Sequence, residues 1–161
     1  MTLTIRTAEA GDEALVLAMI KALASYEREP DAVQATEASI RDTLFGPDPQ
    51  VHSFIAELDG EAIGFALWFL TYSTWTGRPS LYLEDLFVED TARGQGIARA
   101  LFRRLAQEAK RRDCARIDWA VLDWNVDAMA AYERLGGRRQ TGWQPWRLDG
   151  AALDRLAADA G

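Results

Sequence analysis

A pair of closely spaced glycines lies between a predicted strand and a predicted helix. Gly94 and Gly96 follow the apolar strand that ends at Val88 and directly precede an amphipathic helix that begins at Ile97. Glycine permits backbone conformations with positive φ and a close approach of the main chain to a ligand. The amides of the first helical turn, together with the helix dipole, favour an anion at this point. The spacing therefore predicts a turn that can hold a pyrophosphate without a P-loop lysine.

This glycine turn does not match the two common nucleotide-binding sequences. A dinucleotide-binding fold requires a complete Gly-x-Gly-x-x-Gly sequence, and a P-loop requires Gly-Lys followed by Ser or Thr. Neither pattern includes Gly94. Because Gly-x-Gly before a helix is by itself more often a tight turn than a phosphate site, the surrounding sequence has to decide. Two neighbouring arginines, Arg93 and Arg99, can add charge-assisted hydrogen bonds to a phosphate.

Residues 93–98 read Arg-Gly-Gln-Gly-Ile-Ala and resemble the acetyl-CoA signature of the GNAT superfamily, usually Arg/Gln-x-x-Gly-x-Gly/Ala. The resemblance extends over nearly the entire chain, to the diamine acetyltransferase branch and within it to the subgroup called thialysine N-ε-acetyltransferase. It implies one N-acetyltransferase domain over residues 1–161, an α/β fold with a mixed, largely antiparallel central sheet flanked by helices. The other segments that carry it are residues 72–78, 81–88, 120–125 and 131–136.

The same resemblance implies acetyl-CoA as the cosubstrate and assigns residues to it. The strand backbone at residues 86–88 would pair with the pantetheine arm, and the glycine turn would receive the pyrophosphate. Residues 125–128 would line the other side of the arm. The cosubstrate residues implied in this way are Leu86, Phe87, Val88, Arg93, Gly94, Gln95, Gly96, Ile97, Ala98, Arg99, Asn125 and Ala128.

The acceptor that the resemblance implies is a primary amine on a small cationic molecule, such as thialysine, a lysine-like amine or a diamine. Where the family often has Glu-Gly-Trp near the C-terminus, this sequence has Thr141-Gly142-Trp143. The loss of a substrate-binding carboxylate there argues against long polyamines. The implied catalytic residues are Glu84 and Tyr132, and the implied acceptor-binding residues are Tyr26, Glu27, Glu84, Asp85, Trp75 and Trp143.

Acetyl transfer to nitrogen requires a neutral amine, and Glu84 is the residue expected to act as the base. A lysine-like ammonium has a pKa of about 10.4, so its deprotonation at pH 7 costs roughly 4.6 kcal/mol. Glu84 can accept this proton directly or through water, and a backbone amide from residues 86–88 can bind the oxyanion. Tyr132 can protonate the departing thiolate during C–S cleavage. Because Glu84 and Asp85 are adjacent on a strand, we expect them to point to opposite faces, with only one in the site.

Each candidate residue also has an ordinary structural explanation. Without the resemblance, Tyr132 would be interpreted as a helix residue with a buried ring, and Tyr26 with Glu27 as a helix terminus. The adjacent carboxylates could equally be solvated charges at a strand end. We expect His52 to be a surface residue before a strand and Cys114 to be a small apolar filler. The tryptophans expected to serve packing rather than cation–π contacts are Trp75, Trp119, Trp124 and Trp143.

The composition fits one soluble globular domain. The chain has 161 residues, 48% of them apolar and 27% charged, which suits a protein with a hydrophobic core. A net charge of −7 argues against a nucleic-acid partner and agrees with a cationic one. The longest apolar stretches are far shorter than the roughly 20 residues of a membrane helix, and no secretory signal is visible, so we expect a cytoplasmic protein without a membrane partner. With one cysteine and one histidine, no metal site is expected.

The elements that must position these residues follow from periodicity and turn signals. Asp12 is expected to cap a helix that ends near Tyr26, and a helix at residues 36–44 lies in a charged segment that can form a wall over a site. The dipeptide Asp59-Gly60 predicts a hairpin. The remaining predicted elements are helices at residues 97–112 and 126–135, the latter stopped by Gly136-Gly137, a short C-terminal helix, and strands at residues 3–6, 53–58, 61–71, 81–88, 115–122 and 144–148.

The order strand, helix, strand over residues 81–122 predicts parallel pairing of its two strands. The leading hypothesis is a homodimeric acetyltransferase, the homodimer being implied by the resemblance, that transfers an acetyl group directly to a small-molecule amine. Two alternatives stay open. The same fold can acetylate a protein lysine, an amino acid or an amino-bearing antibiotic, or the chain can be a CoA-binding module without activity. The presence of both Glu84 and Tyr132 argues against the second alternative.

Overall fold

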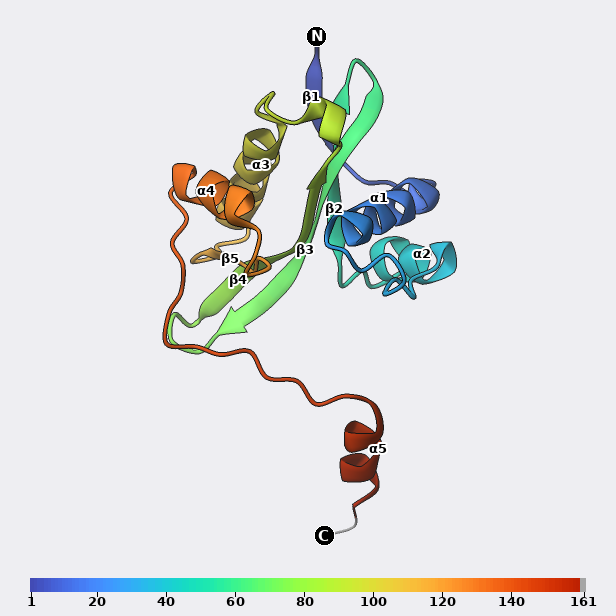
Figure 1. Ribbon diagram of the computed structural model, residues 1–161, viewed down its shortest axis with the longest axis vertical. Coiled ribbons are helices and arrows are strands. Elements are labelled where there is room, and N and C mark those ends of the chain that lie inside the picture. Colours follow the sequence, from blue (N-terminus) through green and yellow to red (C-terminus); the bar gives the residue numbers. More distant parts are fainter. Residues whose placement is uncertain (160–161) are drawn as a thin grey trace. The chain divides into compact units, whose positions relative to one another are not determined.

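The computed structural model describes residues 1–159, which form two compact units. The first comprises residues 1–125, and the second begins at residue 126. The first unit is a five-stranded sheet in the order β1-β2-β3-β4-β5, with helices on both faces (Figure 1). The predicted fold class, α/β with a mixed, largely antiparallel sheet, is confirmed. A single domain over residues 1–161 stays a prediction.

The first four strands pair antiparallel in sequence order, and the fifth joins the fourth in parallel. The hairpin predicted at Asp59-Gly60 is present, and both residues have positive φ, 52° and 86°, as a two-residue type I′ turn requires. The parallel pairing predicted across residues 81–122 is also confirmed. The strands are β1 (Leu3–Thr7), β2 (His52–Leu58), β3 (Glu61–Ser73), β4 (Arg78–Val88) and β5 (Ile117–Trp119).

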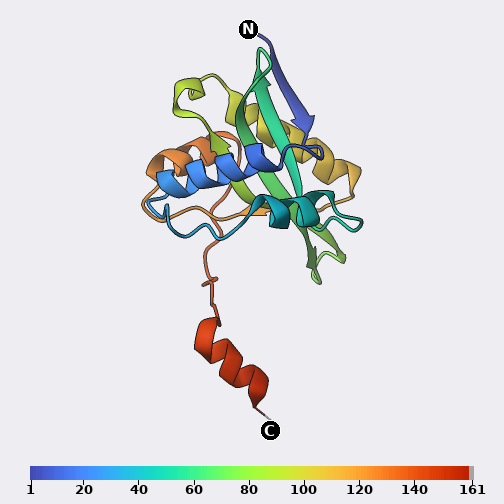
Figure 2. The same cartoon turned by 90° about the vertical axis from the view of Figure 1, so that its right-hand side faces the viewer.

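Helices α1 (Glu13–Tyr26) and α2 (Glu37–Phe45) cover one face of the sheet, and α3 (Ile97–Arg111) covers the other (Figures 1 and 2). Helix α2 begins with a capping box, in which the Ser39 amide donates to Thr36 Oγ1 at 3.1 Å and the Thr36 amide donates to Ser39 Oγ at 2.9 Å. Apolar side chains from α1, α2 and three strands form a buried core. Its members include Val16, Met19, Ile40, Ile55, Phe65, Leu67 and Phe87.

Helix α1 begins after Asp12, but the Asp12 carboxylate does not cap the helix as predicted. It accepts hydrogen bonds from Arg6 Nη1 at 2.7 Å and from the Glu9 amide at 2.7 Å. Arg6 Nε also donates to Glu57 Oε1 at 2.6 Å. A charge-assisted bond from a guanidinium is stronger than a neutral capping bond, so Asp12 instead connects the start of α1 to β1 and, through Arg6, to β2.

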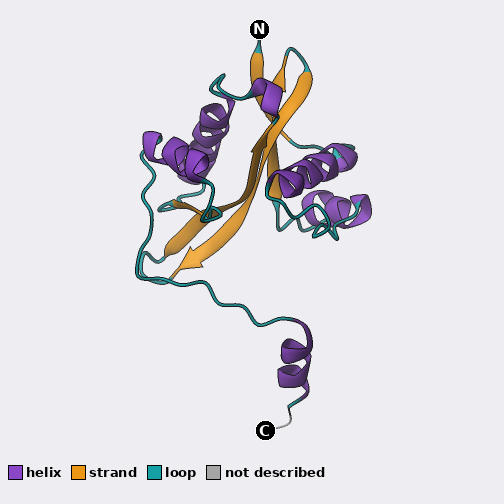
Figure 3. Ribbon diagram, in the orientation of Figure 1, coloured by secondary structure: helices purple, strands orange, loops and turns teal. Residues whose placement is uncertain are grey.

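The second unit contains α4 (Val126–Arg134) and α5 (Gly150–Ala158), joined by a stretch without a helix or strand (Figure 3). Helix α4 stops at the predicted glycines, because Gly136 has a φ of 91° and the Gly137 amide donates to the Tyr132 carbonyl at 2.9 Å. The strand predicted at residues 144–148 is wrong, since the structure describes this segment without strand pairing. A proline at position 145 lacks the amide that a ladder requires.

Candidate active site

A β-bulge interrupts β4 at Glu84. Asp85 pairs with Leu67 of β3 and Leu83 pairs with Trp68, so Glu84 is an additional residue on β4. Leu67 belongs to the core beneath α1. Trp68, the next residue, faces the other side of the sheet, where Arg112 at the end of α3 lies over its ring. Leu83 and Asp85 therefore face opposite sides of the sheet although they are two positions apart. The expectation that Glu84 and Asp85 point to opposite faces rested on regular alternation, which this bulge interrupts.

The bulge also marks the place where β5 ends. The parallel pairing runs from Leu81 opposite Ile117 to Leu83 opposite Trp119 and stops one residue before Glu84. Residues 85–88 therefore pair with β3 on one side, and residues 84–88 pair with no strand of residues 1–159 on the other. The main-chain groups on this open edge can pair with a ligand that lies beside them as an added strand. The early separation of the strands also explains why β5 is shorter than the predicted residues 115–122.

The glycine turn has the conformation that its sequence predicts. Gly94 and Gly96 have φ values of 77° and 80°, and no described atom lies within 4 Å of the place that a Cβ would take at either position. The Ala100 amide donates to the Gly96 carbonyl at 3.0 Å, so the amides of Ile97, Ala98 and Arg99 precede the first helical hydrogen bond. The first turn of α3 contains no acidic residue. The turn thus presents open amides and positive potential, which fit a pyrophosphate.

Arg93 is held by groups of its own chain. Its Nη2 atom lies 2.8 Å from Asp90 Oδ1, and its Nε donates to the Val88 carbonyl at 3.2 Å. Its guanidinium carbon lies 4.6 Å from the centroid of the Tyr26 ring. Arg93 therefore connects the end of β4 to the end of α1. Its predicted contact with a phosphate stays a prediction, and such a contact would compete with Asp90.

Three carboxylates, those of Glu27, Glu84 and Asp85, form an acidic cluster between the end of α1 and the bulge. Burial raises the pKa of Asp85 to about 6, and the charges of Glu84 and Glu27 add to this effect. Burial and the charge of Glu84 also raise the pKa of Glu27. Within residues 1–159, no Lys or Arg forms an ion pair with any of the three. Asp85 is therefore not a solvated strand-end charge, and the cluster can attract a cation.

Aromatic and cationic side chains lie beside this cluster. The Tyr26 hydroxyl donates to Asn125 Oδ1 at 3.4 Å, and the rings of Tyr26 and Trp124 have centroids 6.2 Å apart. The guanidinium carbon of Arg28 lies 4.0 Å from the centroid of the Trp124 ring. The expectation that Trp124 serves packing rather than a cation–π contact is therefore wrong. The sequence analysis missed Arg28. The signal that could have found it is the absence of a glycine directly after the helix that ends near Tyr26, because another residue must then occupy the helix end.

The first unit does not bring Trp75 to the acidic cluster. Trp75 is 87% exposed in the turn between β3 and β4, and Glu84 lies six residues along β4 from Arg78, a span of roughly 20 Å at about 3.3 Å per residue. Ala128 and Tyr132 belong to α4 in the second unit, where their spacing of four residues places them on one helix face. Trp143 follows in the same unit and is 73% exposed. The roles of these residues stay predictions.

His52 and Cys114 both contact the interior of the first unit. His52 begins β2 and stacks on Trp68, with ring centroids 4.5 Å apart, and burial lowers its pKa. His52 is thus half-buried at the start of a strand rather than a plain surface residue, because one face of its ring stacks on Trp68. Cys114 is buried, as expected for an apolar filler. Within residues 1–159, no three or more His, Cys, Asp or Glu residues lie together in a way that could hold a metal ion.

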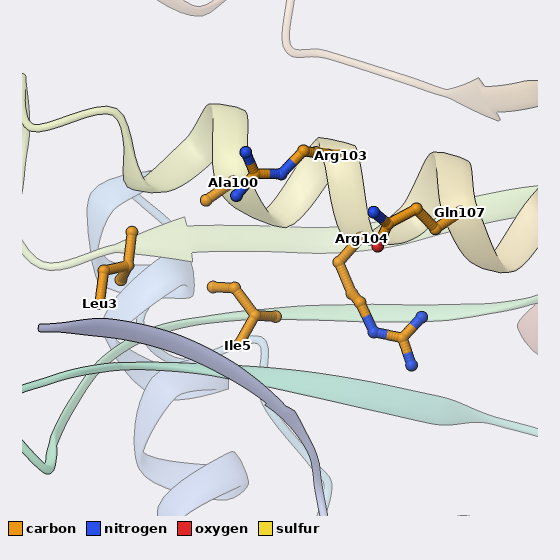
Figure 4. Close-up of a pocket in the computed structure, with 6 residues that line it drawn as sticks. All are labelled: Leu3, Ile5, Ala100, Arg103, Arg104 and Gln107. Carbon is orange, nitrogen blue, oxygen red and sulfur yellow. The ribbon is translucent and has the colours of Figure 1, made fainter.

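A cavity of about 390 Å³ lies apart from these residues. Leu3 and Ile5 point from β1 toward α3 and line its apolar side (Figure 4). None of the residues that line this cavity is a predicted site residue, so it does not belong to the acidic cluster or to the glycine turn. The remaining lining residues, all from α3, are Ala100, Arg103, Arg104 and Gln107.

Comparisons with known proteins show the family. Residues 16–137 match the Acetyltransferase (GNAT) family. The chain is 40% identical over 164 residues to thialysine N-epsilon-acetyltransferase of Sus scrofa, covering 95% of this chain and 96% of that protein. It is 34% identical over 151 residues to spermidine/spermine N(1)-acetyltransferase-like protein 1 of Homo sapiens, covering 89% of this chain and 22% of that protein. A solved integron cassette protein from V. cholerae is 27% identical with a TM-score of 0.81, covering 99% of both chains.

The chain therefore belongs to the GNAT family of acetyltransferases. It is an N-acetyltransferase that takes the acetyl group from acetyl-CoA and transfers it to an amine. The site fits this cosubstrate. The glycine turn at residues 94–96 presents open amides suited to the pyrophosphate, and the open edge of β4 at residues 84–88 suits the amide groups of the pantetheine arm.

Proposed function

We propose that the protein acetylates a terminal primary amine of a small cationic molecule, such as thialysine, a lysine-like amine or a diamine. The acidic cluster of Glu27, Glu84 and Asp85 binds this amine in our proposal. The observation that carries it is the uncompensated negative charge of the cluster at the open edge of β4. The pig relative, named for thialysine, supports an acceptor of this class.

Glu84 is the proposed proton acceptor. Acetyl-CoA supplies the thioester, whose carbonyl carbon the neutral amine attacks. Loss of the proton from an ammonium with a pKa of about 10.4 costs roughly 4.6 kcal/mol at pH 7. Asp85, with a pKa of about 6, is mostly ionised at this pH and can hold the ammonium while Glu84 accepts its proton directly or through water. Both carboxylates interact electrostatically with Glu27, and the bulge at Glu84 interrupts the regular alternation between them.

Tyr132 is the proposed proton donor to the departing thiolate. The variant Tyr132→Phe keeps the ring and removes the proton, so we expect kcat to fall roughly 10²- to 10³-fold while the Kd for acetyl-CoA stays within about threefold. Tyr72→Phe is a suitable control, because Tyr72 is 68% exposed on β3. Steady-state kinetics and calorimetry separate the two quantities. Weaker acetyl-CoA binding with unchanged turnover would contradict the role of proton donor.

The test of the proposed function is a CoA-release assay with a matched series of amines. We expect release with thialysine, lysine and short diamines, less with spermine because of Thr141, and none with Nε-acetyl-lysine, which has no free terminal amine. Binding of CoA without release by any amine would instead support a CoA-binding module. Release of CoA only with a protein lysine or an amino-bearing antibiotic would contradict a small cationic acceptor and support the alternative acceptors.

We also infer a cytoplasmic homodimer. The second unit presents large apolar side chains that a second copy can cover, and α5 has no buried residue. Light scattering of the full chain should give twice its mass of 17.9 kDa, and a mass of one chain at micromolar concentration would contradict the dimer. Among residues 1–159, no helix has the length and apolar character to cross a membrane. The exposed apolar residues of the second unit are Trp143, Trp146, Leu148, Leu153 and Leu156.

A further inference from the structure

Helices α1 and α4 end in the same backbone motif with different residues at its left-handed position. In α4 this position is Gly136, with a φ of 91°. In α1 it is Arg28, with a φ of 67°, whose amide donates to the Ser25 carbonyl at 3.1 Å while the Glu29 amide donates to the Ala24 carbonyl at 2.9 Å. Glycine adopts this conformation without a steric penalty, whereas arginine does not. A strained residue next to a site suggests that its side chain has a function.

Among residues 1–159, the side chain of Arg28 is held by a ring contact rather than by hydrogen bonds from its guanidinium. Its guanidinium carbon lies 4.0 Å from the centroid of the Trp124 ring. Stacking on the ring face restrains the group and leaves its in-plane N–H donors available. Within residues 1–159, its guanidinium donates to no carboxylate, whereas the stacked Arg93 pairs with Asp90. Arg28 is therefore an exposed, oriented cation suited to an anion.

This cation directly follows a member of the acidic cluster. Glu27, whose pKa is raised by burial and by Glu84, is the residue before Arg28. The Arg28 guanidinium stacks on the ring of Trp124. This ring in turn contacts the ring of Tyr26, the residue before Glu27. The acceptor site thus has an acidic end and a cationic end. A diamine carries a cation at both ends, whereas an amino acid with a side-chain amine carries an ammonium at one end and a carboxylate near the other.

We propose that Arg28, held on Trp124, binds the α-carboxylate of the acceptor. The preferred acceptors are then α-amino acids with an amine at the end of the side chain rather than diamines of the same length. This inference rests on the proposed function, because it takes the acidic cluster as the site of the reacting amine. A planar guanidinium binds a carboxylate through two parallel N–H···O bonds, which a lysine ammonium in the same place cannot form.

The test compares two acceptors that differ by one carboxylate, lysine and cadaverine. The wild type should have the higher kcat/KM with lysine. Arg28→Gln should lower kcat/KM for lysine roughly 10- to 100-fold, mainly through KM, because a hydrogen bond to a charged group is lost. The value for cadaverine should rise, because the variant removes a like charge from its second ammonium. Arg28→Lys should recover part of the lysine activity, and Arg116→Gln, at an exposed arginine elsewhere, should leave the lysine-to-cadaverine ratio unchanged.

Arg28→Gly separates a binding role from a structural one. Glycine suits the left-handed position, so this variant should melt at a higher temperature than the wild type while losing the preference for lysine. Equal changes in kcat/KM for lysine and cadaverine in Arg28→Gln would overturn the proposal, and so would a wild type that prefers cadaverine. Loss of the preference while cadaverine is still acetylated supports both proposals. A wild type that acetylates neither acceptor would overturn the proposed function itself, and this inference with it.

Discussion

The single carboxylate of Glu108 and the three carboxylates of the acidic cluster, all in the first unit, differ in their partners. Glu108 of α3 is 4% exposed and is surrounded by Arg104, Arg111 and Arg112, with the Arg112 Nε atom 2.7 Å from Glu108 Oε1. Hydrogen bonds from Arg111 and Arg112 lower its pKa to about 2. In the acidic cluster, burial and neighbouring negative charges raise the pKa of Asp85 to about 6.

The difference shows that a carboxylate paired with arginines stabilises the fold, whereas carboxylates without such partners are available to bind a cation. A carboxylate surrounded by arginines favours its charged form in the folded protein and so stabilises the fold at neutral pH. A buried carboxylate beside other carboxylates disfavours its charged form and destabilises the fold at the same pH. Such an arrangement is expected where a cationic ligand supplies the missing charge. Replacing Glu108 and members of the acidic cluster by the corresponding amides tests this distinction.

The largest effect is expected for Glu84→Gln. If Glu84 accepts the proton of the amine, this variant should lower kcat/KM for lysine or cadaverine roughly 10²- to 10⁴-fold, with acetyl-CoA affinity within about threefold. Its free energy of unfolding should not fall, because Glu84 is exposed and the loss of its charge relieves repulsion on Asp85 and Glu27. Glu61→Gln, at an exposed position of β3, is the matched control. Unchanged amine kinetics across pH would remove Glu84 from the mechanism.

Glu108→Gln should have the opposite profile. We expect the free energy of unfolding at pH 7 to fall by about 1–3 kcal/mol, while kcat/KM stays within about twofold of the wild type. The pKa of Glu108 is lowered from 4.5 to about 2, so its stabilisation is full above pH 4.5 and is lost as the pH falls toward 2. Urea denaturation at pH 7 and pH 3 should show the gap between variant and wild type narrowing at the lower pH. A gap of equal size at both values would contradict this explanation.

Asp85→Asn should stabilise the protein at neutral pH. The folded pKa is raised from 3.8 to about 6, so the wild type loses stability as the pH rises from about 4 to 6. The variant lacks this loss and should be about 1–2 kcal/mol more stable at pH 8, with its advantage disappearing below about pH 4. Asp48→Asn, at an exposed loop position, should show no such pH dependence. A variant less stable than the wild type at pH 8 would contradict the claim that the negative charge of Asp85 is uncompensated and destabilises the fold.

Local signals were sufficient to predict much of the fold. Asp59-Gly60 and Gly136-Gly137 marked a hairpin and a helix end, because left-handed backbone conformations favour these residue types. The glycines at positions 94 and 96 likewise predicted the open turn before α3. The bulge at Glu84 could not be predicted, since it depends on the pairing of β4 with β3 rather than on residues within β4.

The sequence predicted which residues belong to the candidate site, but it did not predict most of the contacts between them. Family resemblance indicated Glu27, Glu84 and Asp85, but only the tertiary structure shows that the three carboxylates interact. Arg28 was missed because its importance depends on a strained conformation and on contact with Trp124, which lies far away in the sequence. Motifs predict the functional groups of this protein, and long-range packing determines their charge environment.

The most direct measurement is an NMR titration of the Asp85 side-chain carboxyl carbon, assigned with Asp85→Asn. In the free protein its pKa should be about 6. With saturating cadaverine and with CoA in place of acetyl-CoA, so that no transfer occurs, the bound ammonium should lower this pKa by about one unit or more. A pKa that stays the same when the amine binds would show that the ammonium lies elsewhere and would contradict the assignment of the acidic cluster as the acceptor site.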